Sequence, residues 1–235
     1  MALIGKEGRK LPRTIAIDGP SASGKSSVGY LVAERLGYLF LDTGATYRAL
    51  TWLALQRGVQ LEDEESLGRL AAQVDMKLGP PAAASCERCT IWVDGEDVTA
   101  VLRRPEVEAG VSLVSRVPRV RRAMVAFQRR LAGRRRVVMA GRDIGTVVLP
   151  NADLKVYLDA SLEERARRRQ EQMATLGRAS SQSAIGEEIL RRDAIDSKRE
   201  ASPLRAAEDA IVINTDGLTQ EQVVERVVTL AEGRS

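Results

Sequence analysis

Residues 14–37 of the chain read TIAIDGPSASGKSSVGYLVAERLG. An apolar run at 14–18 is followed by a turn rich in glycine and serine. Apolar residues then recur at helical spacing, as Val28, Leu31, Val32 and Leu36. This order predicts a buried strand, a loop and an amphipathic helix, with Gly37 just past the end of the helix.

The loop carries a phosphate-binding signature. Residues 19–26, GPSASGKS, match G-x-x-x-x-G-K-[ST], in which backbone N–H groups and the positive end of the next helix face a polyphosphate. The Lys25 ammonium can reach the β- and γ-phosphates, and the Ser26 hydroxyl can ligate Mg²⁺. The pattern predicts a nucleoside triphosphate site formed by Gly19, Pro20, Ser21, Ala22, Ser23, Gly24, Lys25, Ser26 and Ser27.

Further apolar runs follow along the chain and read as strands: 38–42, 135–141, 154–160 and 209–216. A charged helix follows the third of these runs. The run at 209–216 is followed by another helix, whose start Thr219 and Gln222 can cap reciprocally. Five strands that alternate with helices predict an α/β fold, with a five-stranded parallel sheet and helices on both faces.

Two segments interrupt this alternation. Residues 60–115 contain the linker GPPAAAS and two short strand-like runs around Asp94-Gly95, which predicts a β-hairpin near 89–99. Residues 170–205 are polar and charged with few core-forming side chains, which is typical of a mobile flap.

Composition excludes several kinds of chemistry. The 235 residues include no histidine, so triads and metal sites that need histidine are excluded. Cys86 and Cys89 cannot complete a zinc site and are interpreted as incidental thiols. No apolar run is long enough to span a membrane, and no signal-peptide core is visible, so we expect a cytoplasmic protein. Aromatic residues make up only 3%, which argues against stacking on nucleic acid despite a net charge of +4.

Missing motifs exclude some classes of P-loop protein. No N/T-K-x-D is present to read a guanine base, and the strand at 135–141 ends in Ala140-Gly141 where a motor would have an acidic residue. Small P-loop kinases remain, in which arginines hold two phosphorylated substrates in line and no protein base is needed.

Three stretches carry arginine and aspartate in turns where the ligands of open α/β sheets bind: DTGATYR (42–48), GRDIGT (141–146) and RRDAIDSKR (191–199). With the phosphate-binding loop and VSLVSRVPRVR, they resemble the bacterial type of the cytidylate kinase family from about Thr14 to Val228. The resemblance implies a single domain over 1–235 with the P-loop nucleoside-monophosphate kinase fold and core strands in the order 2-3-1-4-5. It also implies a monophosphate-binding insert at 60–115, a lid at about 170–203, and transfer of the ATP γ-phosphate to CMP or dCMP with Mg²⁺.

The same resemblance assigns an acceptor site. Asp143 would accept a hydrogen bond from the cytosine amino group, which uracil lacks. Spacing supports part of the set, since residues 192, 196 and 199 share one face of a helix. The CMP-binding residues implied are Thr43, Tyr47, Arg48, Ser112, Arg121, Arg142, Asp143, Arg192, Asp196 and Arg199.

Catalysis is expected from cations. A basic cluster at 165–169 places Arg165, Arg168 and Arg169 on one helical face, and we expect Lys25, Arg168 and Arg165 to stabilise the transferred phosphoryl group. Ala140 stands where many family members have a carboxylate, so the metal ligands expected here are Ser26 with Asp42 and Asp18.

Rival readings stay open at this point. Another small P-loop kinase, acting on shikimate, dephospho-coenzyme A or AMP, would share the loop. A P-loop regulator that binds nucleic acid would share the basic charge. Under the family resemblance, the expected partners are ATP and CMP or dCMP, with no nucleic acid, no membrane and no second subunit. A panel of acceptors separates these readings.

Overall fold

The computed structural model describes residues 11–81, 89–133, 135–175, 177 and 181–233. Cys86 and most of the predicted linker lie outside these ranges. Among the described helices, none has both the length and the apolar character that crossing a membrane requires.

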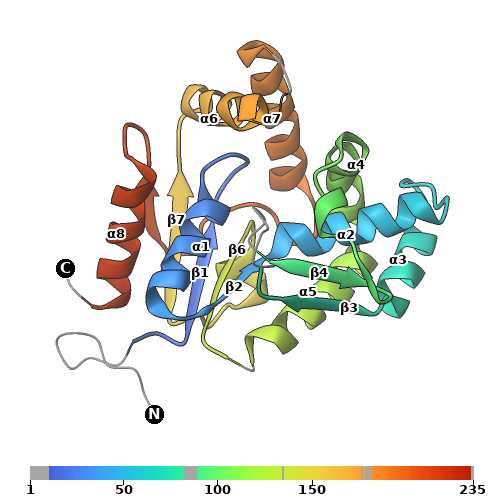
Figure 1. The fold of residues 1–235 in the computed structure, drawn as a ribbon, viewed down its shortest axis with the longest axis horizontal. Helices are drawn as coiled ribbons and strands as arrows, with labels where there is room; N and C mark the ends of the chain where they lie inside the picture. Colours follow the sequence, from blue (N-terminus) through green and yellow to red (C-terminus); the bar gives the residue numbers. More distant parts are fainter. Residues whose placement is uncertain (1–10, 82–88, 134, 176, 178–180, 234–235) are drawn as a thin grey trace.

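A five-stranded sheet forms the centre of the molecule (Figure 1). Its strands run parallel and lie in the spatial order β2-β6-β1-β7-β8. Counted along the chain, these core strands have the order 2-3-1-4-5, so the expected topology is confirmed. Their bounds are β1 Thr14–Asp18, β2 Leu39–Asp42, β6 Val137–Gly141, β7 Leu154–Asp159 and β8 Ile211–Asn214.

Helices cover both faces of this sheet, because its strands alternate apolar side chains to the two sides. Ile15 and Ile17 of β1 pack in one cluster with residues of α1 (Lys25–Leu36) and α8 (Gln220–Ala231). Ala16, between them, belongs to the opposite cluster, which includes α5 (Pro118–Ala132) and the turn η2 (Ile144–Val148). The predicted α/β class is therefore confirmed.

A second group of elements extends from the sheet beyond β2. It contains α2 (Thr43–Gln56), α3 (Glu64–Gln73) and α4 (Pro105–Arg116), which pack with α5 around their own apolar cluster. A small antiparallel sheet lies against them, formed by β3 (Met76–Gly79), β4 (Thr90–Val93) and β5 (Glu96–Asp97), and the short turn η1 (Thr99–Val101) follows it. The chain reverses between β4 and β5 at Asp94 and Gly95, with φ of +51° and +88°. β3 was not expected from the sequence.

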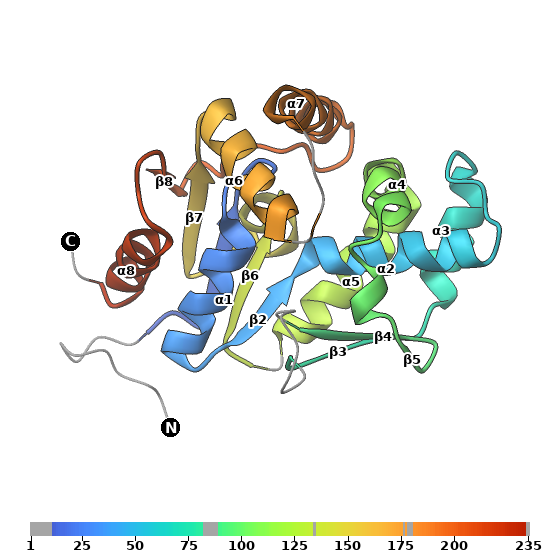
Figure 2. The same ribbon diagram turned by 45° about the horizontal axis from the view of Figure 1, so that its top comes forward.

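Two helices lie beyond the carboxyl ends of β1 and β7 in both views (Figures 1 and 2). They are α6 (Leu162–Thr175) and α7 (Gln182–Lys198). The sequence reading of 170–205 as a segment with few core-forming side chains stays a prediction. Ala166 of α6 packs with Ile185 and Ile189 of α7, so the two helices share a small apolar cluster.

Candidate functional site

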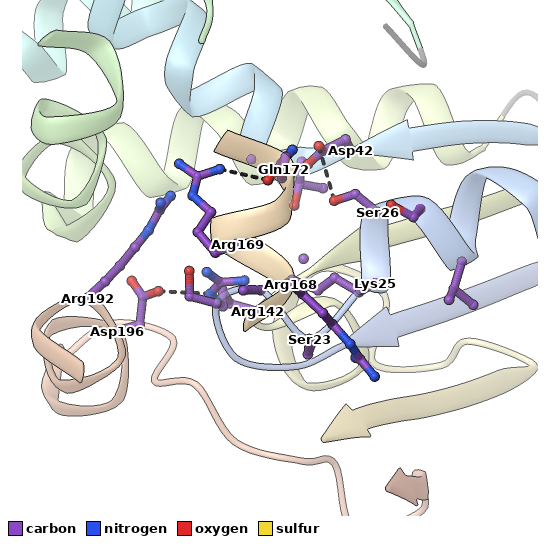
Figure 3. Close-up of a pocket in the computed structure, with 18 of the residues that line it drawn as sticks. Ser23, Lys25, Ser26, Asp42, Arg142, Arg168, Arg169, Gln172, Arg192 and Asp196 are labelled. Atoms are coloured by element: carbon purple, nitrogen blue, oxygen red, sulfur yellow. Dashed lines mark hydrogen bonds and ion pairs between the residues drawn. The ribbon is translucent and has the colours of Figure 1, made fainter. Parts of the chain in front are cut away.

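A cavity of about 560 Å³ opens at the carboxyl end of the parallel sheet, beneath α6 and α7 (Figure 3). Ser21 to Ser27 of the phosphate-binding loop line one side of it. All ten residues that the resemblance assigned to the acceptor also line it, although they come from α2, α4, α5, the turn after β6, and α7 and its C-terminal end. Folding therefore brings the two predicted sites into one cavity.

The loop is shaped to bind an anion. A Cβ at Gly19 would lie 2.2 Å from the Leu158 carbonyl oxygen, so only glycine allows this close approach of loop and β7. No side-chain hydrogen bond caps the N-terminus of α1, and Lys25 and Ser26 at the start of this helix line the cavity. Lys25 Nζ donates to the Pro20 carbonyl at 2.7 Å, and burial together with the Arg142 cation lowers its pKa. The Lys25 ammonium is thus held against the phosphate-binding loop.

Two oxygens of this site fit a magnesium ion. Ser26 Oγ donates to Asp42 Oδ2 at 3.3 Å, and both residues line the cavity (Figure 3). Although burial acts to raise the pKa of Asp42, the Arg48, Arg103 and Lys25 cations hold it at about 2, so the carboxylate stays charged. No group of three acidic, cysteine or histidine side chains suited to a metal occurs in the described part of the chain. Such an ion would depend on ligand phosphates and water for its remaining ligands, as Mg²⁺ commonly does.

The expectation that Asp18 is a metal ligand is corrected by the structure. Its two carboxylate oxygens accept the backbone N–H groups of Ile144 at 2.8 Å and Gly145 at 2.7 Å. The side chain therefore holds the turn η2 against the end of β1 and does not line the cavity. Burial raises the pKa of Asp18 to about 6, against the lowering effect of these two hydrogen bonds.

The floor of the acceptor side is a buried ion-pair cluster around Asp143. Arg121 Nη2 donates to Asp143 Oδ2, and Arg199 Nη2 lies 3.7 Å from Asp143 Oδ1. The Arg121 guanidinium also lies over the Tyr47 ring, 5.3 Å from its centroid. Burial raises the pKa of Tyr47 to about 12, so the phenol remains neutral. A planar ring, a carboxylate and two fixed cations can together orient a polar heterocycle.

Asp196 joins this cluster to the phosphate-binding loop. Arg142 Nε donates to Asp196 Oδ2 at 2.8 Å, and Arg142 Nη1 donates to the Gly19 carbonyl at 3.2 Å (Figure 3). Arg199 Nη1 lies 3.5 Å from the other oxygen of Asp196. α7 ends at Lys198, so Arg199 leaves the helix that the spacing predicted, yet still converges with Asp196 on the same cavity.

Of the three α6 arginines that the sequence placed on one helical face, Arg168 and Arg169 line the cavity and Arg165 does not. Arg168 donates to the Thr215 hydroxyl at 2.9 Å and carbonyl at 2.7 Å, while Arg169 projects to the other side of the helix (Figure 3). Arg165 is buried, donates to the Ser21 carbonyl at 3.1 Å and pairs with Asp193, and it does not line the cavity. The expectation that Arg165 acts on the phosphoryl group is therefore corrected, because its guanidinium fastens α6 and α7 to the loop.

Other lining residues were missed by the sequence reading. Glu108 and Ser115 of α4 face the cavity beside Ser112, and Arg103 lies just before that helix. A signal was present, since positions 108, 112 and 115 carry polar residues at i, i+4 and i+7, while Val107, Val111 and Val114 are buried. The far side of the cavity, near Arg168, was also missed and is lined by Thr215, Leu218, Thr219, Gln220 and Val223.

Comparison with known proteins gives one consistent result. Residues 15–233 match the model of the family described as cytidylate kinase. The chain is 50% identical over 220 residues to a protein named cytidylate kinase from Geobacillus sp. strain WCH70, covering 94% of this chain and 96% of that one. It is 48% identical over 219 residues to a protein of the same name from Chloroflexus aggregans, covering 93% and 94%. Among solved structures, an uncharacterized protein from Eubacterium ventriosum matches with a TM-score of 0.50 and 9% identity, over 94% of this chain and 99% of that chain, which speaks to the fold alone.

Proposed function

This chain belongs to the cytidylate kinase family, and from that membership we propose that it transfers the γ-phosphate of ATP to CMP or dCMP, yielding ADP and the cytidine diphosphate. The observation that carries the proposal is the cavity of about 560 Å³ at the end of the sheet. It holds a phosphate-binding loop on one side and the complete set of ten expected acceptor residues on the other. Two nucleotides bound there would meet with their phosphates facing each other.

Transfer in this site requires positioning more than acid–base chemistry. At neutral pH a phosphate oxygen of CMP is already deprotonated and can attack the γ-phosphorus directly, with the ADP oxygen leaving in line. Lys25 and the N–H groups at the start of α1 would bind the donor phosphates, and Arg48 and Arg142 the acceptor phosphate. Arg168, whose guanidinium lies beside Thr215 on the donor side, would offset the negative charge of the transferred group.

Selection of cytosine is assigned to Asp143. A carboxylate accepts a hydrogen bond from the cytosine amino group, whereas it repels the carbonyl that uracil has at the same position. Arg121 and Arg199 fix the direction of this carboxylate from two sides. The base would therefore be read by a group that cannot turn over to accept uracil.

A magnesium ion would be held by Ser26 and Asp42 together with the nucleotide phosphates. When bound, it would supply positive charge that offsets the negative charge of the nucleotide phosphates. We further propose that residues 60–115 serve as the monophosphate-binding insert and that 170–203 serve as the lid, within one domain. A cytoplasmic monomer that acts without nucleic acid is expected.

The test is an acceptor panel with ATP and Mg²⁺. We expect CMP and dCMP to be phosphorylated far faster than UMP, AMP or shikimate. Lys25→Ala serves as the control, because it removes the donor-binding cation and should abolish transfer without lowering the unfolding temperature. Preferential phosphorylation of another acceptor, or full activity of Lys25→Ala, would overturn the proposal.

A further inference from the structure

Glu108 of α4 is a nearly buried carboxylate surrounded by four guanidinium groups. Its side chain is 10% exposed, and it lines the acceptor half of the cavity. Nitrogens of Arg103, Arg169 and Arg192 each lie 3.4 Å from a carboxylate oxygen, and Arg48 Nε lies at 4.0 Å. These arginines come from α2, the segment before α4, α6 and α7, so one carboxylate links four parts of the chain.

The arginines would repel one another without this carboxylate. Arg169 of α6 and Arg192 of α7 direct their guanidinium groups toward the same region (Figure 3). Burial acts to raise the pKa of Glu108, but the surrounding cations hold it at about 2, so it is ionised at neutral pH. A permanent negative charge therefore stands in the part of the cavity that is richest in positive charge.

Two of the same arginines have a second task under the proposed function. Arg48 would bind the acceptor phosphate, and Arg192 is another of the expected acceptor residues; both are within ionic contact of Glu108. A bound acceptor phosphate and the Glu108 carboxylate would thus compete for the same guanidinium groups. Because the two anions also repel each other, the carboxylate opposes the binding of any acidic ligand at this position.

We propose that Glu108 determines how tightly the acceptor site holds nucleotides according to their charge, and that it weakens the binding of the diphosphate product more than that of the monophosphate substrate. The inference rests on the proposed function. At pH 7.5 CMP carries about two negative charges and CDP about three, whereas cytidine carries none. The repulsion grows with ligand charge, so the carboxylate favours release of the product over loss of the substrate.

The test measures dissociation constants by calorimetry for cytidine, CMP and CDP with wild-type protein, Glu108→Gln and Glu106→Gln. The glutamine at 108 keeps the shape and a hydrogen-bond acceptor but removes the charge. The change at 106 removes a charge from the exposed side of the same helical turn and is the matched control. With screening by water and salt, we expect Glu108→Gln to bind CMP about fivefold and CDP about tenfold more tightly, and cytidine unchanged. Glu106→Gln should change all three by less than about twofold.

The outcomes separate the two proposals. If wild-type protein binds CMP but Glu108→Gln weakens all three ligands equally, the carboxylate merely holds the arginines in place and this inference is wrong. If wild-type protein does not bind CMP at all, the proposed function itself fails. Where Glu108→Gln is too unstable for calorimetry, the rise in unfolding temperature on adding each ligand replaces it. A larger rise than in wild type, in the order CDP, CMP, cytidine, supports the inference, and equal rises refute it.

Discussion

Replacing Asp143 by asparagine is the sharpest single perturbation of the site. The change preserves the shape of the side chain and removes the charge that faces Arg121 and Arg199. It also provides an amide that can turn its NH₂ group toward the ligand. We therefore expect two separate effects, one on stability and one on the choice of base.

The effect on stability follows from the burial of the cluster. The side chains of Arg121, Asp143 and Arg199 are between 4% and 6% exposed. The substitution therefore removes a negative charge from two cations that water cannot solvate in its place. Removing one partner from a buried pair typically costs about 3–5 kcal/mol. Arg121 keeps its bond to the Ser115 carbonyl and Arg199 keeps Asp196, so we expect the lower end, about 3 kcal/mol of unfolding free energy.

The effect on specificity follows from hydrogen-bond polarity. A good polar match to a base edge contributes about 1–3 kcal/mol of discrimination, or roughly 5- to 150-fold. An asparagine can donate to the uracil carbonyl as readily as it accepts from the cytosine amino group. We expect the ratio of kcat/KM for CMP over UMP to fall by about 10- to 100-fold, mainly because UMP becomes a better substrate.

Asp196→Asn provides the matched comparison for this experiment. Asp196 is also buried and paired with two arginines, but it is not the carboxylate assigned to the cytosine amino group. The two variants should lose similar stability in urea denaturation, and only Asp143→Asn should lose the preference for CMP in coupled kinase assays. An unchanged CMP-to-UMP ratio in a folded Asp143→Asn protein would refute the assignment of Asp143 as the base-reading group.

Two further predictions separate catalysis from architecture. Arg168→Ala should lower kcat by about 10³-fold with little change in the KM for CMP, whereas Arg165→Ala, which breaks the buried pair with Asp193, should mainly lower the unfolding temperature. Steady-state kinetics beside thermal unfolding decides this, and the reverse pattern would contradict it. The pKa of Glu108 is held at about 2 in the folded state against an ordinary 4.5. Its charge therefore stabilises the fold by about 3 kcal/mol above pH 5. This stabilisation is lost as the pH falls toward 2. The stability difference between wild type and Glu108→Gln should shrink over that range, and a constant difference would be inconsistent with the ion pairs seen here.

Elements that depend on neighbours in the chain could be predicted from the sequence. The loop at 19–26, the helix after it and the capping of α8 by Thr219 and Gln222 are local, because glycine freedom, apolar spacing and capping act within a few residues. The parallel sheet followed from the alternation of strands and helices. The acceptor residues came from the resemblance of short motifs, since no spacing rule links residues 43 and 199.

Elements that depend on distant neighbours were misjudged. Asp18 precedes the loop and looks like a metal ligand, but its oxygens are taken by the N–H groups of Ile144 and Gly145, more than 120 residues away. Arg165 and Arg168 share a predicted helical face, yet Asp193 of α7 draws one of them into the protein. Helical spacing tells which side chains lie together, but it does not tell what stands opposite them.

The sequence by itself determined that this chain would build a parallel sheet and a loop able to bind a triphosphate. Both follow from backbone geometry and apolar burial over short distances. Only the tertiary structure decided which charges face the cavity and which are neutralised inside the protein. The reason is that Coulomb energies depend on separations of a few ångströms between side chains such as Glu108 and Arg192, and packing alone sets those separations.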